Sequence, residues 1–226
     1  MTVHAEPCDL LSSSAPTRAA TPGRTWTARI AHSRGWAAIL LLVPAGVIGG
    51  VSPLHCPPGT AGYFLFQFFG WRLFVAGALF RWWAILYVGG KKLQTLVVDG
   101  PYSITRNPIY LGTCLLTLSA AVFSQSLLFF VAVLAVAVVY VRFTVRDEEN
   151  SLLALHHDRF REYCQRVPRM VPDFRLLQSP RAVDVQITGL KAEFRRTCRW
   201  AWIPLLCLLL SQMRSESWWP IWFHMP

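Results

Sequence analysis

The sequence predicts an all-α protein, a polytopic transmembrane helical bundle of about five spans with a cytoplasmic amphipathic helical segment. The first observation is composition: 54% of the 226 residues are apolar and only 15% are charged, which is unusual for a soluble domain. The second is that the apolar residues form several long runs. The third is that most basic residues lie between these runs, as in loops that stay on one side of a membrane.

The basic residues indicate membrane orientation rather than nucleic-acid binding. The net charge is +10, but hydrophobic runs separate the basic segments. Of the 22 Lys and Arg residues, only Arg72, Arg81 and Arg214 lie outside segments 1–34, 89–106 and 142–199. The positive-inside rule places these three segments in the cytoplasm, and we expect no nucleic-acid partner. The six cysteines show no CxxC pair and no Cys/His ligand spacing, which predicts free thiols and no metal.

The N-terminal part divides into a leader and two spans. Residues 1–34 lack apolar periodicity and predict a disordered basic leader. Residues 35–88 would hold the first two transmembrane spans, at 36–51 and 63–88, and the second is long enough to cross with some tilt. A cleaved signal peptide is the alternative for the first run, but the leader is long, and Pro44 and Pro53 do not resemble a cleavage site.

The second span carries two arginines, Arg72 and Arg81. Nine residues at 100° each place them on opposite faces of a helix, so they cannot serve one site. Arg72 is expected to anchor the span at an interface. For Arg81 two readings stay open, a functional role inside the bundle and snorkelling to the membrane surface.

Residues 89–175 contain the segment that we expect to form the active site. Within it, the polar stretch 99–112 interrupts two apolar runs, and Pro101 and Pro108 forbid a continuous helix. Irregular backbone near a membrane is tolerated where it is buried in protein or lines a polar cavity, so a bound ligand is expected here. A structured turn between helices is the simpler alternative.

A helical hairpin and an amphipathic helix are predicted next. Two apolar runs, 109–123 and 127–141, are divided by residues 124–126, which indicates a tight hairpin. From 142 to 175 the chain is charged, and one helical stripe carries the apolar residues Leu152, Leu155, Phe160, Tyr163 and Val167. Pro168 and Pro172 end this helix.

Residues 176–226 form a connector, a fifth apolar segment and an aromatic tail. A polar connector is expected at 178–199, then an apolar run at 200–210. Counted on through Trp218, the run could cross the membrane and place the C-terminus outside. Four spans with a re-entrant or surface C-terminal helix is the alternative.

The hairpin brings stretch 99–112 close to the start of the charged segment. Arg142, Arg146 and Glu149 follow at i, i+4 and i+7, so they share one helical face, while Glu148 is turned about a quarter-turn away. Local ion pairs at a solvated helix end would produce the same spacing.

These motifs resemble one known family. The isoprenylcysteine carboxyl methyltransferases and their phospholipid methyltransferase relatives share this pattern over roughly residues 85–175. It consists of Gly100-Pro-Tyr, Arg106-Asn-Pro-x-Tyr-x-Gly112, Glu148-Glu149-x-x-Leu152, Tyr163 and Val167-Pro-Arg169-x-x-Pro172.

The resemblance implies an integral membrane methyltransferase that binds S-adenosyl-L-methionine and takes a lipophilic small molecule, lipid or prenylated acceptor from the bilayer. The implied cofactor-binding residues are Gln94, Thr95, Leu96, Val97, Tyr102, Asn107, Pro108, Ile109, Tyr110 and Glu148. On chemical grounds the candidate catalytic residues are Glu149 or a histidine, which would assist deprotonation of an amine acceptor, and Arg142 or Arg146, which would hold an acceptor carboxylate.

The chain departs from the family pattern at three places. The acceptor-contacting arginine of the family falls near Thr144, which puts carboxyl methylation in question. Asn107 stands where the family often has His, and His156-His157 where it often has Phe-Gly. The histidine pair is expected on an exposed helix face, with an acceptor-side role as the alternative. Three functions therefore stay open: methylation of a carboxylate or thiol, phospholipid N-methylation, or a non-catalytic protein that keeps the fold.

Overall fold

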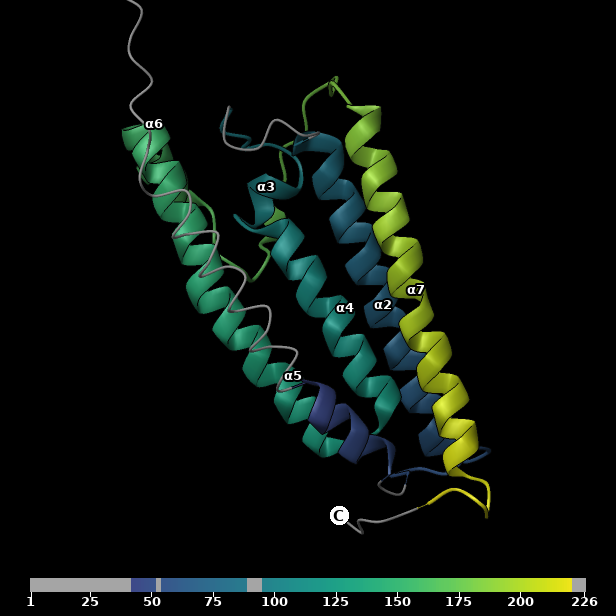
Figure 1. Ribbon diagram of the computed structural model, residues 1–226. Coiled ribbons are helices and arrows are strands. Elements are labelled where there is room, and N and C mark those ends of the chain that lie inside the picture. Colours follow the sequence, from purple (N-terminus) through teal and green to yellow (C-terminus); the bar gives the residue numbers. More distant parts are fainter. Residues whose placement is uncertain (1–41, 52–53, 89–94, 221–226) are drawn as a thin grey trace, which may run out of the picture.

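The computed structural model describes residues 42–51, 54–88 and 95–220, and every regular element in these ranges is helical (Figure 1). The predicted all-α class is confirmed. The elements are α2 (Ala61–Val88), α3 (Pro101–Ile104), α4 (Pro108–Ser124), α5 (Leu127–Tyr140), a π-helical turn η1 (Val141–Val145), α6 (Arg146–Arg166), a 3-10 turn η2 (Phe174–Leu176) and α7 (Ile187–Arg214). The predicted leader and residues 36–41 of the predicted first span lie outside the described residues, and residues 42–50 of that span are helical.

Two helices in the described ranges are long and apolar enough to cross a membrane. They are α2 and the continuous run Leu127–Arg166, which joins α5 to α6. Only 17% and 19% of their most apolar windows are buried, so the large apolar side chains face outward, as Phe64, Phe68 and Val131 do. A core helix of a soluble protein would bury most of this surface. These are the candidate spans, and the total of five remains a prediction.

Helices α2, α4 and α7 lie side by side, and the α5–α6 run lies along the α4 side (Figure 1). Small residues let α2 and α4 approach closely. A methyl group added at Gly112 would lie 2.7 Å from the Gly77 carbonyl oxygen, closer than a Cβ tolerates. Close backbone contact at glycines is typical of helix packing in membranes.

Helix α7 begins earlier than the sequence predicted. The expected connector 178–199 is wrong in its second half, since α7 starts at Ile187. The charged N-terminal half docks on α2 through a hydrogen bond from the Trp82 indole to Thr197 (2.8 Å) and an ion pair between Arg81 and Glu193. This tertiary anchoring overrides a polar composition that is typical of a loop.

Arg81 neither snorkels nor faces the exterior. Its side chain is buried, and its guanidinium contacts both carboxylate oxygens of Glu193, at 2.5 and 3.0 Å, and Thr113 Oγ1 at 2.5 Å. Arg72 is exposed, with its guanidinium 5.3 Å from the centre of the Phe68 ring. The two arginines therefore differ in environment, as their spacing predicted.

The hairpin forms where the sequence placed it. Helix α4 ends at Ser124, Gln125 adopts the left-handed conformation (φ 50°), and α5 begins at Leu127. Beyond α5 the π-helical turn η1, in which hydrogen bonds span five residues, alters the helical phase. The positions of Arg142 and Glu149 around the helix therefore do not follow regular α-helical spacing.

A kink at His157 breaks the predicted apolar stripe of α6. His157 has φ 42° and ψ −115°, outside the helical region. Phe160, Tyr163 and Val167 beyond the kink are buried together, whereas Leu155 before it is 55% exposed. The prediction that one apolar stripe runs across 152–167 was therefore wrong for Leu155, because the kink interrupts the regular helical spacing.

Replacing His157 with glycine is expected to stabilise the protein. A positive φ strains a side-chain-bearing residue by about 1–3 kcal/mol, and glycine adopts it freely. His157→Gly should raise the thermal unfolding midpoint in detergent. Arg159→Gly, at an exposed helical position two residues away, is the control and should lower it, since glycine costs about 1 kcal/mol in a regular helix. Equal lowering by both substitutions would contradict a kink at His157.

Candidate cofactor site

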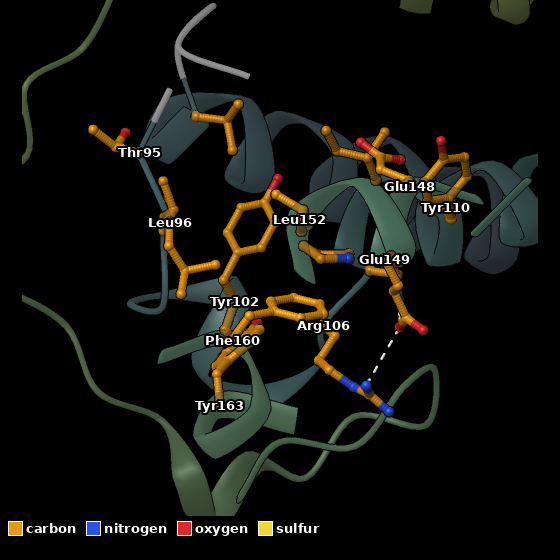
Figure 2. Close-up of a pocket in the computed structure, with 15 residues that line it drawn as sticks. Thr95, Leu96, Tyr102, Arg106, Tyr110, Glu148, Glu149, Leu152, Phe160 and Tyr163 are labelled. Carbon is orange, nitrogen blue, oxygen red and sulfur yellow. Dashed lines mark hydrogen bonds and ion pairs between the residues drawn. The ribbon is translucent and has the colours of Figure 1, made fainter. Parts of the chain in front are cut away.

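A cavity of about 80 Å³, partly open to solvent, lies between the segment that leads into α4 and α6. Figure 2 shows Thr95 and Leu96 on one side, Glu148 and Tyr110 on another, and the Tyr102 ring between them. The lining residues are Val88, Thr95, Leu96, Val97, Tyr102, Arg106, Asn107, Pro108, Ile109, Tyr110, Glu148, Glu149, Leu152, Phe160 and Tyr163.

The two prolines of stretch 99–112 each begin a helix. Pro101 is the first residue of α3 and Pro108 the first of α4, where a missing N–H is tolerated and the fixed φ suits a helix start. Gly100, just before α3, has φ 61°, and the Tyr87 ring would lie 2.3 Å from a Cβ at this position. Only glycine satisfies both conditions, which explains the Gly-Pro-Tyr sequence.

Glu149 joins the motifs that the sequence showed as separate. Its carboxylate accepts hydrogen bonds from Asn107 Nδ2 at 3.2 Å and from Arg169 Nη2 at 2.5 Å. Arg106 lies 3.5 Å from the same carboxylate, an ion pair drawn in Figure 2. Asn107 Nδ2 also donates to the Arg169 carbonyl at 3.1 Å. The Arg-Asn-Pro, Glu-Glu and Val-Pro-Arg motifs thus form one polar cluster.

Backbone hydrogen bonds fix the segment between α3 and α4 against the chain that follows α6. The Arg106 N–H donates to the Pro168 carbonyl at 2.9 Å, and the Asp173 N–H donates to the Ile104 carbonyl at 2.9 Å. Thr105 Oγ1 donates to the Arg169 carbonyl at 3.2 Å. One wall of the cavity is therefore held from behind by residues more than sixty positions later in the chain.

Aromatic rings form another wall. The Tyr163 hydroxyl donates to the Tyr102 carbonyl at 2.7 Å, and Phe160 packs against Tyr163. Burial raises the pKa of Tyr102 well above its usual range, and the neighbouring Tyr163, Glu148 and Tyr110 add to this effect. Tyr102 is therefore neutral at physiological pH and offers a ring face and a hydroxyl.

Two polar atoms in the cavity are buried without a partner in the part of the chain that the structure describes. They are Glu148 Oε2 and Arg106 Nε. A buried polar atom without a hydrogen bond is costly, so such atoms mark places where a ligand completes the site. A carboxylate suits ammonium or hydroxyl groups, a guanidinium suits a carboxylate, and the aromatic faces suit a cation or a flat ring. S-adenosylmethionine carries all these groups, so the residues fit this cofactor.

The structure brings together nearly all the residues predicted to bind the cofactor. Thr95, Leu96, Val97, Tyr102, Asn107, Pro108, Ile109, Tyr110 and Glu148 line the cavity, while Gln94 lies outside the described residues.

The predicted catalytic residues separate into two environments. Glu149 lines the cavity, but Arg142 and Arg146 are exposed and do not line it. Arg142 lies within the π-helical turn, so its position around the helix relative to Glu149 departs from the regular spacing assumed for a shared face.

Five lining residues were not predicted to belong to the site, either as cofactor-binding or as catalytic residues: Val88, Arg106, Leu152, Phe160 and Tyr163. Signals for most of them were present. Arg106 directly precedes Asn107 in its motif, and Leu152, Phe160 and Tyr163 lie on the amphipathic stripe, whose buried face becomes a cavity wall.

Comparison with known proteins identifies the class. The phospholipid methyltransferase family profile matches residues 65–159, which include most of α2, the hairpin and the Glu-Glu motif. The chain belongs to this family, as its motifs predicted. Helix α7 lies outside the matched segment.

Two curated relatives are similar over about two thirds of their length. The cobalt-zinc-cadmium resistance protein CzcN of Cupriavidus metallidurans is 30% identical over 162 residues, which cover 68% of this chain and 69% of CzcN. The nickel-cobalt-cadmium resistance protein NccN of Alcaligenes xylosoxydans xylosoxydans is 25% identical over 146 residues, covering 65% of this chain and 68% of NccN. No solved structure matches the chain.

Proposed function

We propose that this protein is an integral membrane methyltransferase that uses S-adenosylmethionine and methylates a lipophilic acceptor from the cytoplasmic side of the membrane. The observation that carries this proposal is the cavity in which the paired family motifs meet, where a carboxylate oxygen of Glu148 and the Nε of Arg106 are buried and have no hydrogen-bond partner among the described residues. The family match supports the reaction class.

The residues of the cavity suit cofactor binding and alignment. When bound, S-adenosylmethionine would supply a methyl group on a sulfonium, whose transfer is an in-line displacement that depends on alignment and exclusion of water. Glu148 would accept hydrogen bonds from its ammonium or hydroxyl groups, and Arg106 would hold its carboxylate. The Tyr102 and Phe160 rings would provide aromatic faces and keep water out.

Glu149 is assigned a positioning role in this proposal. Its carboxylate contacts Asn107, Arg106 and Arg169, so it holds three segments in register around the cavity. Proton removal by Glu149 from an amine acceptor would require it to release these partners.

The acceptor class has two candidates. An isoprenylcysteine-like carboxylate or thiol is one, and a phospholipid amine is the other, which the description of the matching family favours. Incubation of membranes that contain the protein with methyl-labelled S-adenosylmethionine distinguishes them, because a methyl ester is released by base and a methylated headgroup is not. Since both relatives are named for metal resistance, membranes from cells grown with and without cobalt or cadmium should be compared.

Removal of Glu148 or of the Asn107 amide is expected to weaken cofactor binding. Glu148→Ala and Asn107→Ala should each raise the calorimetric Kd for S-adenosylmethionine by about tenfold or more, since each removes a charged or amide group from the cavity. Asn150→Ala is the control, because Asn150 lies on the same helix but is exposed and does not line this cavity. Wild-type affinity in both cavity variants would refute the site, and absence of binding by the wild type would refute the enzyme.

A further inference from the structure

A second cavity of about 570 Å³ lies between α4 and α7 beside the cofactor site. Its walls include Arg81, Arg196, Arg199 and Trp200, together with Ile109 and Tyr110, which also line the first cavity. The two cavities are thus neighbours that share one side of the α4 N-terminus. Three arginines line the second cavity, and two of them come from α7, outside the segment that the family profile matches.

The charges around this cavity do not balance. Glu193 is 1% exposed and accepts hydrogen bonds from Arg81 and from Arg196, whose Nη1 lies 2.6 Å from Oε2. One carboxylate therefore faces two guanidinium groups. Arg199, three residues after Arg196 on the same face of α7, has no hydrogen-bond or ion-pair partner among the described residues. The cavity carries a surplus of positive charge.

The surroundings are apolar on the side away from the arginines. Trp200 and Ile203 continue the cavity wall along α7, and beyond them Trp202, Leu205 and Leu206 are exposed. A ligand with an anionic headgroup and an apolar chain matches both features. A cationic headgroup would meet the surplus of guanidinium groups and is disfavoured.

We propose that this cavity binds the anionic headgroup of an amphiphile, with Arg199 and Arg196 as its ligands, and that this amphiphile is the methyl acceptor. The assignment of the acceptor rests on the proposed function, and the anion site stands on the geometry. It places the acceptor's anionic contact on α7, where Arg196 and Arg199 are exposed but line the second cavity, rather than on Arg142 and Arg146, which line neither cavity.

The test uses the full-length protein in the neutral detergent dodecyl maltoside, with dodecyl phosphate as the probe and thermophoresis as the measurement. Arg199→Gln should weaken binding about tenfold, because it removes an unpaired charged donor. Arg195→Gln is the matched control: Arg195 is exposed on the same helix and does not line the cavity, so its affinity should stay within about twofold. Equal affinity of wild type and Arg199→Gln would overturn the site, as would tighter binding of dodecyltrimethylammonium than of dodecyl phosphate.

Two further measurements distinguish a free anion from an amphiphile, and failure of the anion-site proposal from failure of the proposed function. Inorganic phosphate should displace dodecyl phosphate poorly; if it competes equally, the site binds a free anion and the amphiphile is overturned. S-adenosylmethionine binding should be unchanged in Arg199→Gln. Wild-type protein that binds S-adenosylmethionine but not dodecyl phosphate overturns the anion site and leaves the cofactor site intact. Wild-type protein that binds dodecyl phosphate but not S-adenosylmethionine overturns the enzyme and leaves the anion site.

Discussion

Glu193→Ala is expected to lower the free energy of unfolding by about 3–5 kcal/mol, because it leaves the Arg81 guanidinium buried without its carboxylate. The two residues lie 112 positions apart and tie α7 to α2, so the effect should appear as a loss of α7 docking. Thermal unfolding in detergent, followed by fluorescence and by proteolysis within α7, measures it.

The double variant Arg81→Met with Glu193→Leu separates charge from packing. It removes both charges and keeps apolar volume, and replacement of a buried ion pair in this way is often neutral or stabilising. We expect it to recover most of the lost stability. Glu162→Ala, at an exposed position in α6, should change the midpoint little. A Glu193→Ala protein as stable as the wild type would contradict the buried pair.

Glu149→Ala is expected to abolish measurable cofactor binding and also to destabilise the protein. The carboxylate is 12% exposed and contacts Arg106, Asn107 and Arg169, so its removal leaves the half-buried Arg106 guanidinium beside the cavity without this ion pair. We expect a loss of about 2–4 kcal/mol of stability, as for a buried charge-assisted hydrogen-bond cluster. Calorimetry with S-adenosylmethionine and thermal unfolding measure the two effects.

The comparison with Glu148→Ala tests the positioning role. One Glu148 carboxylate oxygen has no hydrogen-bond partner within residues 42–51, 54–88 and 95–220, so removal of Glu148 should weaken cofactor binding without loss of stability. Glu149→Gln keeps an acceptor oxygen but loses the charge and should fall between wild type and Glu149→Ala in both measurements. If Glu149→Ala reduces cofactor binding with an unchanged unfolding midpoint, the positioning role is refuted and direct contact with the ligand is favoured.

Local patterns in the sequence predicted most of the helical framework and most of the residues that line the candidate cofactor cavity. Pro101 and Pro108 predicted that no continuous helix runs through 99–112, and the short break at 124–126 predicted the hairpin. The motifs predicted that Asn107 and Glu148 would line one cavity, which the structure places together. These features depend on residue types and short spacings, which a sequence displays directly.

Features that depend on distant contacts or on backbone irregularity could not be predicted. The pairing of Arg81 with Glu193 joins two residues that no spacing rule connects, and it explains why charged residues 187–199 are helical. The π-helical turn and the kink at His157 alter the helical phase, so regular periodicity misplaced Leu155 and Arg142 relative to the buried face. Neither position carries a proline or glycine to signal the irregularity.

The hydrogen bonds between residues 104–107 and the chain that follows α6 also determine when the wall of the cavity can form during synthesis. Residues 104–107 emerge from the ribosome about sixty positions before their partners at 163–173, since Thr105 and Arg169 are 64 positions apart. Until then the Asn107 amide and the Arg106 guanidinium lack the protein groups that hold them. This wall of the cavity is therefore completed only after the hairpin and α6 have been made. A nascent chain that stops before Arg169 would carry the Arg-Asn-Pro and Glu-Glu motifs without the residues that hold them in place.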